Sequence, residues 1–343
     1  MNKKFDLTVY IPTYNSAQTL HETLNSIINQ TLQPNEIIVS DNISNDKTIE
    51  IATEYNTKGI KIITNINNNF NDVTNTEKGI SNFNFILKHC KTKYLAIYHS
   101  DDIYYPTILE EQYNLIKNHD DAVAIFTKGK ILHSNIFFKD IINKYYAYLF
   151  YYTKYNYQSL LKQNILKGNP FDFPTMFLNI SKIRNIQLNN KYEQATDLDY
   201  IFKLTTKGTI LRINKALYLR RISETQDSAI GKERYKYTIK PSFDLINDLL
   251  NTSNLTNFYY KIYNTSLFSE KIRCYLNKLK NNQNIDYLRI NFQEINLFYI
   301  FLYRKKYFII ISLYIFVHYL FLPKYRKKYH LKVRNYFKFL YNV

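Results

Sequence analysis

Apolar, β-prone runs alternate along the first 100 residues with segments whose apolar side chains recur at helical spacing. The pattern predicts strands over residues 7–11, 36–40, 60–63 and 94–98. It predicts helices over residues 20–30, 48–55 and 79–87. Strands that alternate with helices of this length are typical of an α/β fold with a doubly wound, mostly parallel sheet.

Polar residues follow three of these strands. In a parallel sheet, ligands bind beyond the carboxyl ends of the strands. The residues at these ends are Pro12, Thr13 and Tyr14 after the first strand, Asp41 and Asn42 after the second, and Ser100, Asp101 and Asp102 after the fourth. We therefore expect three clusters from separate parts of the chain to meet at one edge of the sheet.

Asp101 and Asp102 are the strongest candidates for chemistry. They are adjacent carboxylates at the end of a buried strand, and a divalent cation that also binds a phosphate-bearing ligand would best relieve their repulsion. The alternative is that both residues only cap the helix that begins near Pro106.

The second half of the chain adds a further acidic segment. Strands are predicted over residues 121–126, 171–178, 209–214 and 216–219. Among them lies a predicted helix that has Asp197 in its first turn and Thr196 as its cap. Asp199 points to another face of that helix, where a solvated or capping role is the simplest interpretation.

Composition and charge narrow the compartment and the partners. The 45% share of hydrophobic residues predicts an ordered chain, and Cys90 and Cys274 lie too far apart in sequence to indicate a disulfide framework. We expect a reducing, cytoplasmic compartment and no secretory signal. A net charge of +18 suits nucleic acid or anionic lipid. Because no compact nucleic-acid recognition motif occurs, we expect no nucleic acid as a partner.

The C-terminal region, residues 231–343, has a different composition and is expected to be a basic, helical appendage. Its residues 307–322 are apolar except for Ser312 and His318, and cations flank them on both sides. The segment is short for a membrane span. We expect it to attach the protein peripherally to the anionic inner face of the cell membrane, with a buried core helix as the alternative.

The motifs of the first 110 residues resemble, in order and spacing, the inverting glycosyltransferases with the GT-A fold, and family 2 in particular. The segments that carry the resemblance are VYIPTYN, SDNISNDKT and HSDDIYYP, together with Asn84 and Tyr94. The resemblance implies a GT-A domain over residues 1–230. Its nucleotide-sugar-binding half would span residues 1–110, and its acceptor and catalytic half residues 111–230.

The resemblance also implies roles for individual residues. Nucleotide binding would involve Pro12, Thr13, Tyr14, Asp41, Asn42, Asn84, Ser100 and Arg221. Asp101 would hold Mn²⁺ or Mg²⁺ with support from Asp102, although His99 stands where the family usually has an acidic residue. Asp197 would be the catalytic base, and the alternative is an ordinary aspartate at a helix start, favoured there by the helix dipole.

The neighbouring Arg220 is the other candidate for contact with the diphosphate, and a surface charge pair is the alternative for both arginines. The aromatic segment 145–157 could stack on an acceptor sugar, pack in the core or form a flap.

The implied function is transfer, with inversion, of a sugar from a UDP-, GDP- or dTDP-sugar to a glycan acceptor, for which a lipid-linked glycan is one candidate. Such a reaction would belong to bacterial surface polysaccharide, lipopolysaccharide or capsule synthesis. The alternative is a nucleotide- or nucleic-acid-binding protein that uses the same sheet edge without catalysis.

Overall fold

The computed structural model describes residues 5–64, 75–132, 147, 149–222, 240–251 and 263. The chain divides into two units. One comprises Met1–Gln163 and Asn169–Gly231, and the other comprises Asn164–Gly168 and Lys232–Val343.

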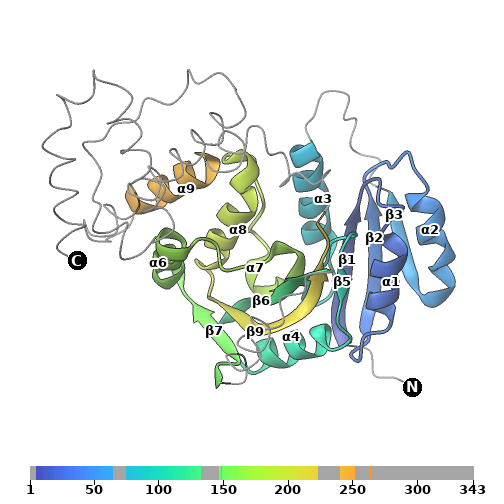
Figure 1. Ribbon diagram of the computed structural model, residues 1–343, viewed down its shortest axis with the longest axis horizontal. Helices are drawn as coiled ribbons and strands as arrows, with labels where there is room; N and C mark the ends of the chain where they lie inside the picture. The colour runs from blue at the N-terminus through green and yellow to red at the C-terminus, as the bar shows by residue number, and fades with distance from the viewer. Residues whose placement is uncertain are drawn as a thin grey trace, which may run out of the picture. The chain divides into compact units, whose positions relative to one another are not determined.

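Four parallel strands form the first half of one sheet (Figure 1). They are β1 (Phe5–Thr13), β2 (Pro34–Asp41), β3 (Ile60–Thr64) and β4 (Tyr94–Ile97), in the order β3-β2-β1-β4. The helices between them are α1 (Leu20–Ile28), α2 (Thr48–Glu54) and α3 (Asn75–His89). Each strand and helix expected over the first 100 residues is therefore confirmed, with small differences at the ends.

β1 continues through Pro12, whereas the sequence predicts its end at residue 11. The carbonyl of Tyr10 accepts the N–H of Tyr98 at 3.0 Å, so Tyr10 directs its backbone groups toward β4. Backbone groups alternate in direction from one residue to the next along a strand, so those of Pro12 point to the same side as those of Tyr10. At the position of Pro12, β4 has already ended, at Ile97. The proline therefore removes no hydrogen bond from the ladder with β2.

The second half of the sheet is mixed in direction. β8 (Met176–Asn179) runs antiparallel to β4 and to β6 (Ala122–Ile131). β9 (Thr209–Arg220) runs parallel to β6 and antiparallel to β5 (Ile103–Tyr104) and β7 (Tyr152–Tyr155). The helices of this half are α4 (Ile108–Lys117), α6 (Tyr157–Lys167), α7 (Ile180–Ile183) and α8 (Thr196–Leu204). The expected parallel arrangement thus holds mainly for the first half.

The predicted strand over residues 171–178 is wrong in its first part. Phe173–Thr175 form a 3₁₀ turn, η2, and the strand begins only at Met176. The turn follows from Pro174, whose fixed φ favours such a turn and which lacks a donor for a strand ladder.

The two short strands predicted at residues 209–214 and 216–219 are one strand, β9. Thr127 of β6 pairs with Ile213, but the next residue, Lys128, pairs with Ala216. Two residues of β9 are therefore unmatched at this point, as in a β-bulge. Lys215, which separates the two predicted strands, lies in this irregular stretch.

Helices cover both faces of the sheet. On one face, alternate residues of β1 pack with apolar residues of α1, α2 and α4; the cluster includes Leu7, Val9, Leu24, Ile51 and Ile116. On the opposite face, the hydroxyl of Tyr10 reaches Asn82 of α3 at 2.5 Å. With both faces covered, the polar residues at the carboxyl ends of the strands are the surface that the first half of the sheet offers to ligands.

The second unit contains α9 (Lys240–Asn251). Leu245, Ile246 and Leu250 of this helix are buried, as is Tyr263. Residues 307–322, and Cys274, lie outside the described residues. Among the helices that the structure describes, none is long and apolar enough to cross a membrane.

Candidate active site

The acidic loop, defined here as residues 98–102, leaves the carboxyl end of β4 and leads into β5. One ligand atom from each of His99, Asp101 and Asp102 lies within 4.8 Å of the others. The two carboxylates singled out in the sequence therefore meet an imidazole from the same loop. In the sequence, His99 stood out only as a departure from the family pattern.

Asp102 is buried and tied to the end of β9. Its Oδ1 accepts the backbone N–H of Arg221 at 3.0 Å. Burial, and after it the charge of Asp101, raise the pKa of the Asp102 carboxyl to about 7. A bound divalent cation would favour the ionised form of this carboxyl and displace its proton.

His99 offers a neutral nitrogen beside the two carboxylates. Burial lowers the pKa of the imidazole against the opposing effect of Asp101, and the charge of Arg220 lowers it further. The neutral ring is the form that binds metal ions. The ring lies edge-on to Phe173, with 6.3 Å between centroids.

These donors fit a divalent cation. Carboxylates and a neutral imidazole are both ligands that divalent metal ions take in proteins. The capping alternative is not what the structure shows. α4 begins at Ile108 with Thr107 at its N-cap, and the Asp102 carboxylate binds Arg221 instead.

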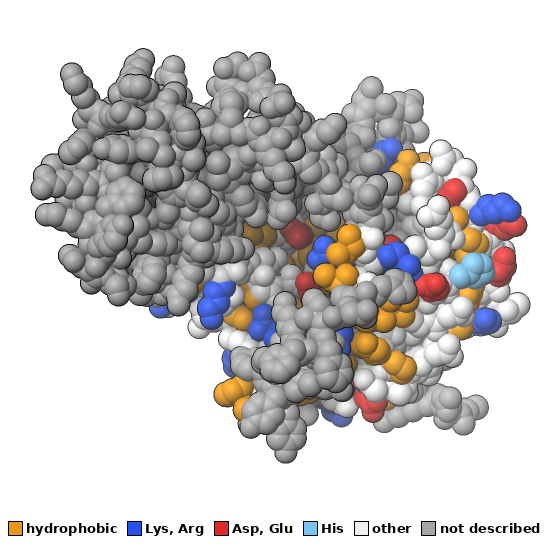
Figure 2. All heavy atoms as spheres, in the orientation of Figure 1, with side chains coloured by type: hydrophobic (Ala, Val, Ile, Leu, Met, Phe, Trp, Pro, Cys, Tyr) orange, Lys and Arg blue, Asp and Glu red, His pale blue; other side chains and the backbone are white. Residues whose placement is uncertain are grey.

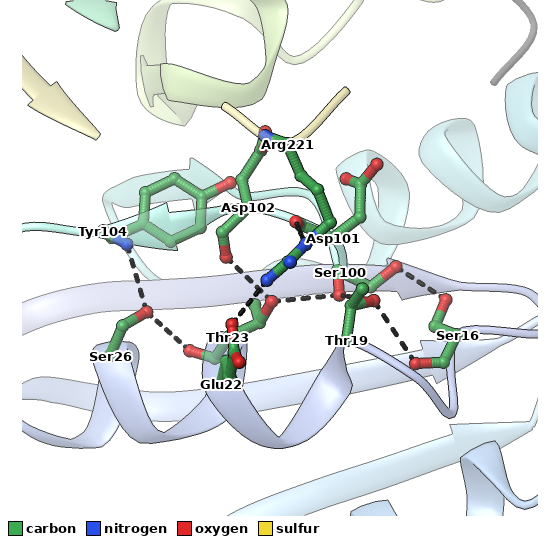
Figure 3. Close-up of polar contacts among 10 residues, drawn as sticks. All are labelled: Ser16, Thr19, Glu22, Thr23, Ser26, Ser100, Asp101, Asp102, Tyr104 and Arg221. Carbon is green, nitrogen blue, oxygen red and sulfur yellow. Dashed lines mark hydrogen bonds and ion pairs between the residues drawn. The ribbon is translucent and has the colours of Figure 1, made fainter. Parts of the chain in front are cut away.

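Side chains of α1 and of its N-cap, Thr19, hold the acidic loop from below, and Arg221 contacts it from above (Figure 3). Thr19 and Thr23 donate their hydroxyls to the carbonyl of Ser100, each at 2.9 Å. The Nε of Arg221 donates to the carbonyl of Asp101 at 3.1 Å, and its guanidinium pairs with Glu22 of α1. The guanidinium of Arg221, predicted to contact the diphosphate, is thus engaged with the loop and α1.

Thr13 and Asp41 meet at the carboxyl ends of β1 and β2, as the sequence predicts. Asp41 is fully buried, and its Oδ1 accepts the hydroxyls of Thr13 at 3.1 Å and Ser44 at 2.6 Å. Its Oδ2 accepts the N–H of Ser44 at 2.8 Å. The carboxylate therefore fixes the loop after β2 against the end of β1.

Tyr14 and Asn42 lie beside this cluster. Tyr14 is 43% exposed, and the Nζ of Lys78 is 5.7 Å from the centroid of its ring. The side-chain amide of Asn42 donates to the carbonyl of Lys78 at 3.4 Å, while its buried Oδ1 has no hydrogen-bond partner among the described residues. A water molecule or a ligand could donate a hydrogen bond to this oxygen.

Asn84 bonds to the loop after α7. Its side-chain amide donates to the carbonyl of Leu188 and accepts the N–H of the same residue, both at 2.9 Å. Asn82 is the α3 residue that reaches the end of β2, where its Oδ1 accepts the hydroxyl of Ser40 at 2.6 Å. The nucleotide-binding role of Asn84 stays a prediction.

Asp197 lies in the first turn of α8, as predicted. Its Oδ1 accepts the N–H of Leu198 at 2.7 Å, and burial raises the pKa of its carboxyl. A chain of aromatic contacts connects α8 to the acidic loop. Tyr200 packs on Phe83 with 5.2 Å between centroids, Phe83 lies 5.9 Å from Phe173, and Phe173 packs on His99.

Two expectations about α8 are wrong. Its N-cap is Ala195, and Thr196 is already helical and donates its hydroxyl to the carbonyl of Glu193 at 2.6 Å. Asp199 is buried and pairs with Lys203 at 2.5 Å, so it is neither solvated nor a cap. This pairing has the i,i+4 spacing that brings two side chains together on a helix.

Asp172 was not among the residues predicted from the sequence. Arg221, which was predicted to contact the diphosphate, is less exposed than Arg220. Asp172 lies just before η2, its Oδ2 accepts the N–H of Gly129 at 3.2 Å, and burial raises the pKa of its carboxyl. Arg220 is exposed, and its charge acts on His99, Asp102 and Asp172. The signal available for Asp172 was an acidic residue directly before a proline-containing turn.

Known proteins share the sequence pattern of this chain. A family model described as Glycosyl transferase family 2 matches residues 8–185. Poly(ribitol-phosphate) beta-N-acetylglucosaminyltransferase TarP of Staphylococcus aureus is 28% identical over 258 residues, which cover 64% of this chain and 75% of the relative. UDP-Glc:alpha-D-GlcNAc-diphosphoundecaprenol beta-1,3-glucosyltransferase WfgD of Escherichia coli is 26% identical over 204 residues, which cover 54% of this chain and 73% of the relative.

Solved structures share the fold. S. aureus TarS 1-349 in complex with UDP has a TM-score of 0.55 and 18% identity, covering 83% of this chain and 76% of that one. Mannosyltransferase PcManGT from Pyrobaculum calidifontis, in complex with GDP-Man and Mn²⁺, has a TM-score of 0.51 and 12% identity, covering 78% and 70%. The expected GT-A fold is confirmed. Because the family match spans more than half of the chain and includes the acidic loop, the protein belongs to glycosyl transferase family 2.

Proposed function

We propose that this glycosyltransferase moves a sugar, with inversion, from a nucleotide-diphosphate donor to a glycan acceptor in the synthesis of a bacterial surface polysaccharide. The observation that carries the proposal is the gathering of His99, Asp101 and Asp102 within 4.8 Å at the carboxyl edge of the sheet. The names of TarP and WfgD, both sugar transferases, support the reaction class. The nucleotides in the TarS and PcManGT structures, UDP and GDP-Man, support the donor class.

The donor would occupy the edge formed by the ends of β1, β2 and β4. The exposed ring of Tyr14 offers a surface on which the base can stack, and the buried Oδ1 of Asn42 can accept a hydrogen bond from it. Asp41 supports this region through Thr13 and Ser44. Pro12 and Ser100 lie at the same strand ends, so the residues implied for nucleotide binding, apart from Asn84, belong to one edge.

The diphosphate would lie against the acidic loop. His99, Asp101 and Asp102 would hold Mn²⁺ there, or Mg²⁺ with a weaker bond to His99. The bound cation would neutralise the negative charge that develops on the leaving diphosphate. Arg220 adds an exposed positive charge next to the same loop. Its planar guanidinium suits phosphate oxygens.

Asp197 is proposed as the general base. In transfer with inversion, the acceptor oxygen attacks the anomeric carbon from the face opposite the diphosphate, and the bond from that carbon to the diphosphate oxygen breaks with its electron pair. The acceptor hydroxyl gives its proton to a carboxylate. Burial raises the pKa of Asp197, which makes its carboxylate a stronger base than an exposed aspartate.

Attachment to the anionic inner face of the membrane is part of the same proposal. The support is the sequence of residues 307–322 and the cations around it, together with the +18 net charge. The acceptor would then be a glycan carried on a membrane lipid. A nucleic-acid-binding function would instead require a cationic sheet edge, whereas this edge gathers carboxylates, and the face in Figure 2 mixes both signs of charge.

Calorimetric titration of UDP, GDP and dTDP with and without Mn²⁺ tests the proposal. We expect one nucleotide to bind in a Mn²⁺-dependent way, and Asp101→Ala to abolish both this binding and sugar transfer while leaving the thermal unfolding midpoint unchanged. Mass spectrometry of a sugar-nucleotide panel then identifies the donor by its hydrolysis. Full activity of purified Asp101→Ala would overturn the metal site, and no nucleotide binding by the wild type would overturn the function.

A further inference from the structure

The acidic loop rests on a row of hydroxyl groups along α1 and the turn that leads into it. Ser16, Thr19, Thr23 and Ser26 recur at intervals of three and four residues, which places them on one side of the helix. All four contact residues 100–104 (Figure 3). The Oγ atoms of Ser16 and Ser100 are 2.7 Å apart, and the N–H of Tyr104 donates to Ser26 at 3.1 Å. The row therefore follows the chain from Ser100 to Tyr104.

Thr23 has the central place in this row. Its buried hydroxyl lies within hydrogen-bond distance of two carbonyls, that of Ser100 at 2.9 Å and that of Asp102 at 2.8 Å. These carbonyls stand on either side of Asp101. The carbonyl of Asp101 itself points the other way and accepts the Nε of Arg221 at 3.1 Å. The backbone around Asp101 is thus held from both sides.

We propose that Thr23 is a positioning residue that sets the affinity of the acidic loop for its divalent cation. The inference rests on the proposed metal-dependent function. By sharing its single proton between the carbonyls on both sides of Asp101, the hydroxyl fixes the spacing of the ligand atoms of His99, Asp101 and Asp102. Partners that orient metal ligands in this way typically change metal affinity by about 10–100-fold when they are removed.

The hydroxyl, and not only the shape of the side chain, carries the effect. Valine has nearly the same volume as threonine but cannot donate, so Thr23→Val leaves the carbonyl of Asp102 without this bond. The carbonyl of Ser100 keeps its bond from Thr19. Loss of the hydroxyl therefore loosens the loop mainly on the Asp102 side, where a ligand carboxylate is attached.

Titration of Mn²⁺ in the presence of UDP, or of whichever diphosphate binds the wild type, measures the effect directly. We expect Thr23→Val to weaken Mn²⁺ binding about tenfold or more, and Thr23→Ser, which keeps the hydroxyl, to remain within about threefold of the wild type. If Thr23→Val does not fold, Thr23→Ala also removes the hydroxyl and should weaken Mn²⁺ binding in the same direction.

Thr92→Val is the matched control. Thr92 is also buried and donates to a backbone carbonyl, that of Tyr94 at 2.8 Å, but it precedes β4 at the opposite end of that strand. It should lose thermal stability like Thr23→Val and keep the Mn²⁺ affinity of the wild type. Unchanged affinity in Thr23→Val, or equal weakening in Thr92→Val, would overturn the inference while leaving the proposed function standing. A wild-type protein that binds no Mn²⁺ would overturn both.

Discussion

The backbone N–H of Arg221 donates to the Oδ1 of Asp102 at 3.0 Å, although 119 positions separate the two residues. The end of β9 therefore closes on the acidic loop at the end of β4. The hydrogen bond from Arg221 by itself lowers the pKa of the Asp102 carboxyl, but burial, and after it the charge of Asp101, outweigh this effect and raise the pKa to about 7. A group with a pKa of about 7 gives the metal site a pH dependence in the physiological range.

Mn²⁺ affinity should rise with pH and level off above pH 7. Below that pH the Asp102 carboxyl holds a proton that the cation must displace, so the affinity should fall by up to about tenfold for each pH unit between roughly 7 and 5. The sign follows from the raised pKa, because the proton is held more tightly than by an ordinary aspartate. Mn²⁺ titrations at several pH values measure this. Asp102→Asn should weaken Mn²⁺ binding and flatten the pH dependence of the Mn²⁺ affinity. If the affinity of this variant changed with pH as in the wild type, the proton that the cation displaces would belong to another group.

Asp197→Asn should lower the turnover number while donor binding survives. Asparagine keeps the shape of the side chain but cannot accept the acceptor proton, and loss of general base catalysis costs about 10²-fold or more. Turnover and calorimetric donor affinity are the two measurements. Equal losses in both would show that Asp197 has a binding or structural role instead. Asp199→Asn is the control within the same helix, because it removes the pair with Lys203 and should affect stability more than turnover.

Arg220 and Arg221 should respond differently to substitution. Arg220→Gln removes an exposed charge beside the acidic loop and should weaken nucleoside diphosphate binding much more than nucleoside binding. Arg221→Gln breaks contacts with Asp101 and Glu22 and should weaken Mn²⁺ binding as well. Titrations with UDP, uridine and Mn²⁺ separate the two effects. If Arg220→Gln bound UDP as tightly as the wild type does, Arg221 would again be the candidate for contact with the diphosphate.

Gly129→Ala should destabilise the fold by roughly 1–3 kcal/mol, as overpacking in a core does. A Cβ at this position would clash with the ring of Tyr218, which packs 6.0 Å from Tyr104 between centroids. Gly79→Ala is the opposite case. That helical position has no atom within 4 Å of an added Cβ, and alanine should stabilise α3 by about 0.5–1 kcal/mol. Denaturant unfolding of both variants checks the contrast, and similar stability changes would contradict it.

Removal of residues 304–343 should release the protein from anionic liposomes and leave Mn²⁺-dependent nucleotide binding unchanged. Cations near residues 307–322 would each add up to about 1 kcal/mol on an anionic surface. High salt should only weaken attachment of the full-length chain, because salt does not screen the apolar contribution. Flotation with anionic and neutral vesicles measures this. If truncation also abolished nucleotide binding, the segment would belong to the core.

The sequence by itself determined the local elements and the identity of the polar edge. Each strand of the first half carries its own apolar run. The segments between these strands are helices, which are too long for hairpin turns, so the strands are expected to be parallel. Because the carboxyl ends of parallel strands lie at one edge, Thr13, Asp41 and Asp101 could be grouped from their positions in the chain alone. Asp197 could be placed in a first helical turn in a similar way, since the start of a helix and its periodicity are local signals.

Only the tertiary structure decided which groups contact one another across long sequence separations. Antiparallel strands of the second half depend on pairing partners, so no local pattern predicted that β8 would lie between β4 and β6. The burial that raises the pKa of Asp102 and lowers that of His99 comes from the packing of distant segments around the loop. The same holds for Thr23, whose spacing in α1 was visible in the sequence, but whose two carbonyl partners are set by how the loop after β4 packs on that helix.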